Sequence, residues 1–190
     1  DWYKGTANAI YQNISFIDSY DPEYVIILSG DQICKQDYAD FLRFHKEKGA
    51  EFSVAVMEVD WKEASRFGLM VADEDDKITE FQEKPPVPKS NLASMGIYIF
   101  NWDILKKYLE EDEADPNSKN DFGMNIIPAL LRDGRKMYAY HFNGYWRDVG
   151  TIDSLWEANM EVLDPENSGI DIFDEKWKIY SRNPVLPAQK

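Results

Sequence analysis

Two aspartates stand at points in the sequence where a divalent cation could be bound. Asp31 follows the continuous apolar run Tyr24–Leu28 through Ser29 and Gly30. The run is typical of a parallel strand buried on both faces, and open α/β sheets bind ligands at the carboxyl ends of such strands. Gly30 allows a close backbone approach, and a carboxylate there is a natural ligand for a hard cation. The alternative is a turn aspartate that caps the next helix.

The second aspartate, Asp148, lies in the segment Tyr145–Thr151 beside Trp146. A tryptophan ring can cover the apolar face of a hexose, so this segment suits a sugar-lined cleft. If Asp148 and Asp31 converge, they form a two-carboxylate site for Mg²⁺, which binds one or two carboxylates together with substrate phosphates. The alternative is that Trp146 belongs to the core and Asp148 pairs with Arg147. The separation along the chain favours neither hypothesis.

Two further segments carry groups that suit a phosphate. Lys84 precedes Pro85 at the end of an expected strand, where its ammonium group could serve as a point charge. The alternative is a solvated lysine beside Glu83. Gly5 and Thr6 come just before an expected helix and could present backbone N–H groups to a nucleotide. An ordinary helix cap explains that spacing equally well.

Alternating strands and helices must position these residues. The hydrophobic pattern predicts an α/β domain of three layers with a mixed, mostly parallel sheet. An acidic run at 110–115 is expected to be a solvated loop. The expected helices are 6–20, 37–48, 102–109, 122–131 and 152–163, and the expected strands are 24–28, 52–57, 67–71, 78–81, 93–100 and 137–142.

The composition excludes several classes of function. The net charge of −14 over 190 residues disfavours binding to nucleic-acid backbones. No apolar run approaches the ~20 residues that span a bilayer, so no membrane partner is expected. The single cysteine, Cys34, fits a reducing cytosol, and the two histidines lie in no zinc-type pattern.

Together these segments resemble the nucleotidyltransferase domain of ADP-glucose pyrophosphorylases (glucose-1-phosphate adenylyltransferases) of the bacterial glycogen-synthesis type. The resemblance covers nearly the whole chain and depends on the order and spacing of its motifs. These motifs are Trp2–Ala7, Ser29–Asp31, Ser65–Gly68, Phe81–Pro85, Ser90–Tyr98, Asp121–Gly123, Ile126–Pro128 and Tyr145–Thr151.

The resemblance implies a Rossmann-like, GT-A-like catalytic domain over residues 1–163, incomplete at its N-terminus because the family's Gly-rich loop is absent. Residues 164–190 would be a linker towards a missing C-terminal left-handed β-helix, and Arg182-Asn-Pro184 resembles that linker. We therefore expect this chain to be a fragment that is inactive alone.

The resemblance also implies roles for single residues. Asp31 and Asp148 would hold Mg²⁺, and Lys84 would contact the phosphate of glucose 1-phosphate. The resemblance places further side chains around the sugar and the nucleotide. Those around glucose 1-phosphate are Glu83, Ser94, Tyr98, Asp121, Phe122 and Trp146, and those on the ATP side are Trp2, Tyr3, Gly5, Thr6 and Gly30.

The implied protein is a cytoplasmic, allosteric homotetramer, with a regulatory paralogue as a further partner. Gln32 and Cys34 depart from the family, which has histidine and tyrosine at these places. One alternative is therefore a non-catalytic regulatory subunit. A second is a related sugar-1-phosphate nucleotidyltransferase with another base or sugar. A third is a glycosyltransferase, although Ser29–Asp31 lacks the first carboxylate of an Asp-x-Asp motif.

Overall fold

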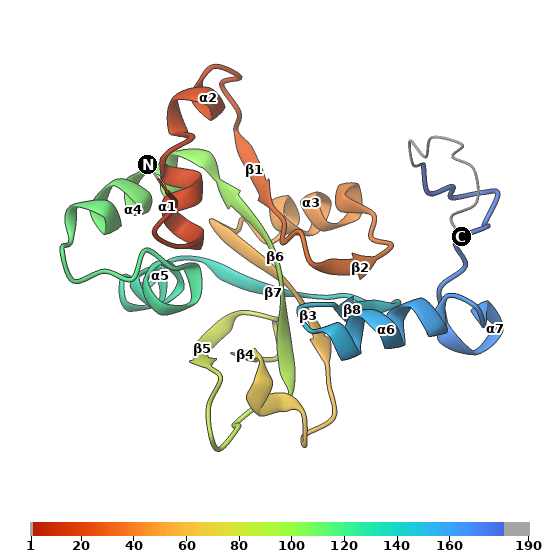
Figure 1. Ribbon diagram of the computed structural model, residues 1–190. Coiled ribbons are helices and arrows are strands. Elements are labelled where there is room, and N and C mark those ends of the chain that lie inside the picture. The colour runs from red at the N-terminus through yellow and green to blue at the C-terminus, as the bar shows by residue number, and fades with distance from the viewer. Residues whose placement is uncertain (1, 181–190) are drawn as a thin grey trace. The chain divides into compact units, whose positions relative to one another are not determined.

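The structure is a computed structural model that describes residues 2–180 (Figure 1). These residues divide into two compact units. We define unit 1 as residues 2–29 and 37–143, and unit 2 as residues 30–36 and 144–180. No helix within the described residues is long and apolar enough to cross a membrane.

A six-stranded mixed sheet forms the centre of unit 1. Its order is β5-β4-β6-β3-β7, and β1 also pairs with β6. Strand β3 is parallel to β7, and the other described pairs in this sheet are antiparallel. The strands are β1 (Tyr24–Ile27), β3 (Phe52–Glu58), β4 (Gly68–Ala72), β5 (Ile78–Glu83), β6 (Leu92–Asn101) and β7 (Met137–His141).

Helices cover both faces of this sheet. Alternation along β3 directs Phe52, Val54 and Val56 into a core with the helices α1, α4 and α5. Ser53 points the other way, towards His45 of α3. The helices α1, α4 and α5 therefore lie on one side of the sheet and α3 on the other (Figure 1), which confirms the three-layer α/β prediction. The helical segments are α1 (Thr6–Tyr11), α2 (Ile14–Asp18), α3 (Tyr38–Glu47), the 3₁₀ turn Ala64–Arg66, α4 (Trp102–Ala114), the π-helical segment Phe122–Ile126 and α5 (Ile127–Arg132).

Two expectations about the strands are wrong. Parallel pairs do not predominate, because β6 runs antiparallel to β1, β3 and β4. Hydrophobic runs indicate burial but carry no information about strand direction. Strand β1 is also not buried on both faces, since Ile26 is 38% exposed. Among the described residues, β1 pairs with β6 alone.

Two expectations about the helices also need correction. The predicted helix 6–20 is interrupted, because the side-chain amide of Asn13 donates to Ala9 O at 2.8 Å and the Asn13 backbone amide bonds to Ile10 O instead. The acidic run expected as a loop continues α4 to Ala114. Glu113 there accepts hydrogen bonds from Lys4 and Asn8 of the N-terminal segment, which stabilise this last turn of the helix.

Unit 2 contains a two-stranded antiparallel sheet and two helices. The strands are β2 (Gln32–Cys34) and β8 (Trp146–Asp148), and the helices are α6 (Ile152–Glu161) and α7 (Pro165–Ser168). Neither short strand is predicted by the hydrophobic pattern. Helix α7 lies in the expected linker, whose boundary at 163/164 stays a prediction. The expected linker motif Arg182-Asn-Pro184 lies outside the described residues.

Candidate functional site

The two aspartates expected to bind metal meet across the small sheet of unit 2. Gln32 pairs with Asp148 in the β2–β8 ladder, and the amide of Val149 donates to Asp31 O at 2.9 Å. A Cβ atom added to Gly150 would lie 3.0 Å from Asp148 Oδ1 and 3.7 Å from Asp31 Oδ2. Both carboxylates therefore border the same point on the backbone. The amide of Gly150 donates to Asp148 Oδ1 at 2.8 Å, which orients that carboxylate.

This carboxylate pair fits the ligand preferences of Mg²⁺. The ion takes hard oxygen ligands in an octahedron and keeps open positions for water and substrate phosphates. The described residues contain no group of three or more His, Cys, Asp or Glu side chains that could hold a metal by themselves. Two neighbouring carboxylates, one before β2 and one at the end of β8, therefore suit an ion that substrate phosphates help to hold. Their role as metal ligands stays a prediction.

The contacts of Arg147 test the alternative hypothesis that Asp148 pairs with it. Arg147 pairs with Glu161 and lies 3.9 Å from Glu157, so the hypothesis of a local Arg147–Asp148 pair is wrong. Trp146 is half-buried, and its indole Nε1 donates to Gln32 Oε1 at 3.3 Å.

Cys34 lies opposite Trp146 in the β2–β8 ladder. Burial raises the pKa of its thiol. The group therefore stays protonated at neutral pH, as expected of a structural cysteine.

A second cluster of expected site residues lies in unit 1. Glu83 ends β5, and Asp121 caps the π-helical segment by accepting from Met124 N at 2.9 Å. A Cβ atom on Gly123 would lie 2.7 Å from Glu83 Oε2 and 3.4 Å from Asp121 Oδ1, so both carboxylates border Gly123. Burial raises the pKa of Glu83, Lys84 opposes this shift and Asp121 adds to it.

Aromatic rings complete this cluster. Tyr98 shares a side-chain hydrogen bond with Ser94, and its ring centroid lies 5.7 Å from that of Phe122. Burial raises the pKa of Tyr98 to about 12, and the charges of Glu83 and Asp121 act in the same direction. Its hydroxyl is therefore protonated at neutral pH. Phe122 is buried in the core of unit 1, so the carboxylates and hydroxyls are the groups of this cluster that suit the recognition of a sugar.

Five of the six expected sugar-binding residues thus gather in unit 1. They are Glu83, Ser94, Tyr98, Asp121 and Phe122. The sixth, Trp146, belongs to unit 2. The hydrophobic pattern did not single out Gly68 and Gly123, which flank the Glu83 carboxylate. Signals for both glycines were available in the motifs Ser65–Gly68 and Asp121–Gly123.

Lys84 directly follows this cluster and has an unusual backbone conformation. Its φ of +43° lies in the left-handed region, which a lysine rarely adopts. The ammonium group lies 4.0 Å from Glu83 Oε1, and the side chain is largely exposed. Backbone strain of this kind is concentrated at functional sites. This geometry leaves the charge of Lys84 accessible to an anionic ligand.

The N-terminal segment has a different arrangement from the one expected. The amides of Ala7 and Asn8 already donate to Asn120 O, at 2.8 Å and 3.3 Å. A Cβ atom on Gly5 would lie 2.4 Å from the same carbonyl oxygen, so close packing requires this glycine. The hydroxyl of Thr6 donates to Asp121 Oδ2 at 2.9 Å and accepts from Phe122 N at 3.1 Å.

Other residues expected on the ATP side differ in their surroundings. Trp2 is 96% exposed, and the hydroxyl of Tyr3 accepts from Asn13 Nδ2 at 3.3 Å. A Cβ atom on Gly30 would meet nothing within 4 Å. Nucleotide binding by Trp2, Tyr3, Gly5, Thr6 and Gly30 stays a prediction.

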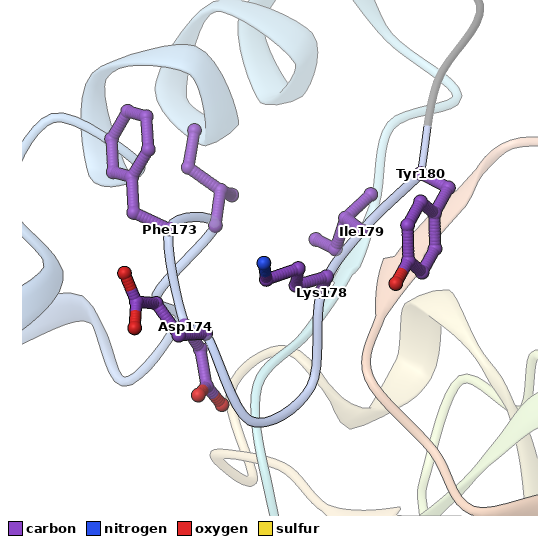
Figure 2. A pocket seen from close by; sticks show the side chains of 7 residues that line it. Phe173, Asp174, Lys178, Ile179 and Tyr180 are labelled. Carbon is purple, nitrogen blue, oxygen red and sulfur yellow. The ribbon is translucent and has the colours of Figure 1, made fainter.

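Unit 2 also contains a cavity of about 300 Å³ in its C-terminal segment (Figure 2). Figure 2 shows Asp174 and Lys178 on one loop with Phe173, Ile179 and Tyr180. Asp174 Oδ2 accepts from Lys35 Nζ at 3.1 Å, so this carboxylate already has a partner. None of the expected site residues lines the cavity, and we do not assign it to the candidate site.

Comparison with known proteins identifies the family. Residues 2–165 match the nucleotidyl transferase family. The chain belongs to this family. Curated relatives named "Glucose-1-phosphate adenylyltransferase" match all of the chain: it is 68% identical to the protein from Clostridium beijerinckii, 66% to that from Clostridium acetobutylicum and 62% to that from Desulforamulus reducens. It covers 49%, 50% and 47% of these proteins, respectively, so this nucleotidyl transferase chain spans about half their length.

Proposed function

We propose that the protein transfers the adenylyl group of ATP to glucose 1-phosphate, giving ADP-glucose and pyrophosphate. The observation that carries this proposal is the carboxylate pair Asp31 and Asp148, which borders Gly150 in a nucleotidyl transferase chain. The names of the relatives supply the two substrates. The family resemblance further supports a role in glycogen synthesis by a cytoplasmic homotetramer under allosteric control.

The reaction needs no general base. A phosphate oxygen of glucose 1-phosphate is already anionic at neutral pH, and it attacks the α-phosphorus of ATP while pyrophosphate leaves. Catalysis then depends on positioning the two substrates and on neutralising their negative charge. Bound Mg²⁺ would offset charge on the α-phosphate and on the leaving group. Asp31 and Asp148 are the residues that would hold it.

The cluster in unit 1 would bind the sugar phosphate. Glu83 and Asp121 offer carboxylate oxygens that accept hydrogen bonds from sugar hydroxyls, and Phe122 lies beside them. The protonated Tyr98 hydroxyl can donate to a sugar oxygen. Lys84 would contact the phosphate, so that the attacking oxygen is held by an ammonium group outside the sugar-binding cluster. The acidic net charge of the chain makes these cationic contacts more necessary, because both substrates are polyanions.

The test is pyrophosphate release by the full-length protein in the presence of Mg²⁺. The panel crosses ATP, dTTP, UTP and GTP with glucose 1-phosphate and mannose 1-phosphate. We expect release with ATP and glucose 1-phosphate alone. Asp31→Asn should abolish it, whereas Asp103→Asn, an exposed aspartate in the first turn of α4, should not.

Other results would favour the alternatives. Release with another base or sugar would indicate a related sugar-1-phosphate nucleotidyltransferase. No pyrophosphate release with any substrate pair, together with stimulation of a catalytic partner, would indicate a regulatory subunit. In that case Gln32→His and Cys34→Tyr would be the first substitutions to try. The isolated 190-residue chain should be inactive, and release at the full-length rate would contradict this expectation.

A further inference from the structure

The face of β8 opposite Asp148 carries a set of contacts that the proposed reaction does not use. Side chains alternate along a strand, so Tyr145 and Arg147 point away from the side of Trp146 and Asp148. Both meet Glu161, the last residue of α6. The hydroxyl of Tyr145 donates to Glu161 Oε2 at 2.5 Å, and Arg147 Nε donates to the same oxygen at 3.2 Å.

The contact between Arg147 and Glu161 is bidentate. The second guanidinium nitrogen donates to Glu161 Oε1. Paired hydrogen bonds between a guanidinium and a carboxylate fix direction as well as distance, so they restrain two elements more tightly than a single contact does. Tyr145, Arg147 and Glu161 thus form a bracket that joins β8 to the far end of α6.

The near end of α6 is fixed separately. Thr151 and Ser154 form a reciprocal capping box at its first turn. The turn between β8 and α6 contains Gly150, whose amide orients the Asp148 carboxylate. Both ends of α6 are therefore restrained, the first by its capping box and the last by its contacts with Tyr145 and Arg147. Asp148 lies at the turn between β8 and α6.

The small sheet needs such support. The β2–β8 ladder has only three residue pairs, and an isolated two-stranded ribbon is marginally stable in water. Ligands of a functional site must be held within about 0.5 Å of the productive geometry. A ladder this short cannot provide that precision for a carboxylate at its end, but a strand tied to a capped helix can.

We propose that Tyr145, Arg147 and Glu161 are positioning residues that hold the Asp148 carboxylate beside Asp31 for the metal ion. The proposal depends on the proposed function, in which Asp148 is a metal ligand. Residues that orient metal ligands without touching the ion typically change affinity about 10–100-fold when substituted.

The test measures metal binding without turnover. In the full-length protein, Mn²⁺ binding is followed by the loss of the free-ion signal in electron paramagnetic resonance. We expect Glu161→Gln to weaken Mn²⁺ binding about tenfold, at the lower end of the range for such residues. The matched control is Glu157→Gln on the same helix, because Glu157 lies 3.9 Å from Arg147 and makes no close hydrogen bond to it. Its affinity should stay within about twofold of wild type.

Two reference variants separate the possible failures. If Asp148→Asn binds Mn²⁺ as wild type does, the metal site of the proposed function is wrong and the bracket has no site to position. If Asp148→Asn loses binding while Glu161→Gln binds as wild type does, only the positioning role is overturned. A lower thermal midpoint with unchanged affinity would show that the bracket contributes to stability alone, and would also overturn the proposal.

A milder substitution keeps the test decisive if Glu161→Gln fails to fold. Tyr145→Phe removes one donor to Glu161 and leaves the Arg147 pair intact. We expect Tyr145→Phe to weaken Mn²⁺ binding a few-fold. Arg147→Lys keeps the positive charge but cannot make the bidentate contact with Glu161, so it should weaken Mn²⁺ binding more. The KM for glucose 1-phosphate should change little in these variants. Wild-type Mn²⁺ affinity in both of them would overturn the proposal.

Discussion

The hydroxyl of Thr6 donates to Asp121 Oδ2 at 2.9 Å, across more than a hundred residues of sequence. The same hydroxyl accepts from Phe122 N at 3.1 Å. Thr6 therefore orients a carboxylate of the proposed sugar-binding cluster, while Asn120 O accepts hydrogen bonds from the amides that follow Thr6. A residue expected near the nucleotide thus contacts the residues expected near the sugar.

Thr6→Val should weaken sugar-phosphate binding. Valine keeps the shape of threonine but removes both hydrogen bonds, each worth about 1 kcal/mol. We expect the KM for glucose 1-phosphate to rise about fivefold, which corresponds to about 1 kcal/mol, with the KM for ATP unchanged. Thr79→Val is the matched control, because the hydroxyl of Thr79 donates only to Val71 O in the β4–β5 hairpin. A selective rise in the KM for ATP would instead support the nucleotide-binding hypothesis for Thr6.

Gly123→Ala should displace the carboxylate of Glu83. The added methyl group would lie 2.7 Å from Glu83 Oε2, which is the flexible end of a side chain. The carboxylate can move, so we expect the free energy of unfolding to fall by only about 1 kcal/mol. The KM for glucose 1-phosphate should rise about tenfold or more, since a displaced acceptor loses about 1–3 kcal/mol of binding.

A double-mutant cycle checks this cause. In the Glu83→Ala background, Gly123→Ala should add little further loss of affinity, because no carboxylate remains to be displaced. Fully additive effects on the KM would show that Gly123 acts on the sugar without Glu83.

The elements that could be predicted from the sequence are those with long, regular patterns. The β4–β5 hairpin has two apolar runs around an acidic turn, and α3 has a clear apolar face that ends before Gly49. Both were predicted to within a few residues. The motif Asp121–Gly123 also pointed to residues that lie together in the structure, because Asp121 caps its own segment and borders Gly123 beside Glu83.

The pairing of β2 with β8 could not be predicted in the same way. Each strand has three residues, and more than a hundred residues separate them along the chain. Segments this short bury too little apolar surface to produce a periodic signal. The convergence of Asp31 with Asp148 therefore stayed one of two hypotheses. The hydrogen bond from Thr6 to Asp121 could not be predicted either, because spacing alone does not show which group a helix N-terminus contacts.

His45 should make stability depend on pH. Its ring is buried, with Nδ1 2.8 Å from Ser53 Oγ and Nε2 2.9 Å from Asn101 Oδ1. Burial lowers the pKa of His45 below 6.5, so the unfolded chain binds a proton more readily than the folded one. Stability from this residue is therefore complete above pH 6.5 and is lost as the pH falls below that value.

Urea unfolding between pH 5 and pH 8 measures this effect. His45→Gln can keep a hydrogen bond but cannot titrate, so its stability should change less across this range than that of wild type. The control is His141→Gln, because His141 is exposed at the end of β7. Parallel pH curves for wild type and His45→Gln would contradict the prediction.

Two substitutions of Lys84 can separate the effect of its charge on activity from the effect of its backbone strain on stability. Lys84→Gln removes the ammonium group, and a hydrogen bond to a charged group is worth about 1.5–3 kcal/mol, so the kcat/KM for glucose 1-phosphate should fall about 10–100-fold. Lys89→Gln is the matched control, because Lys89 pairs with Glu80 outside the cluster. Lys84→Gly removes the same charge but relieves the cost of a φ of +43°, so its stability should exceed that of Lys84→Gln by about 1 kcal/mol or more. Both variants should lose activity to a similar extent if the ammonium group binds the phosphate. Activity near wild type in either one would show that Lys84 has only a structural role at the end of β5.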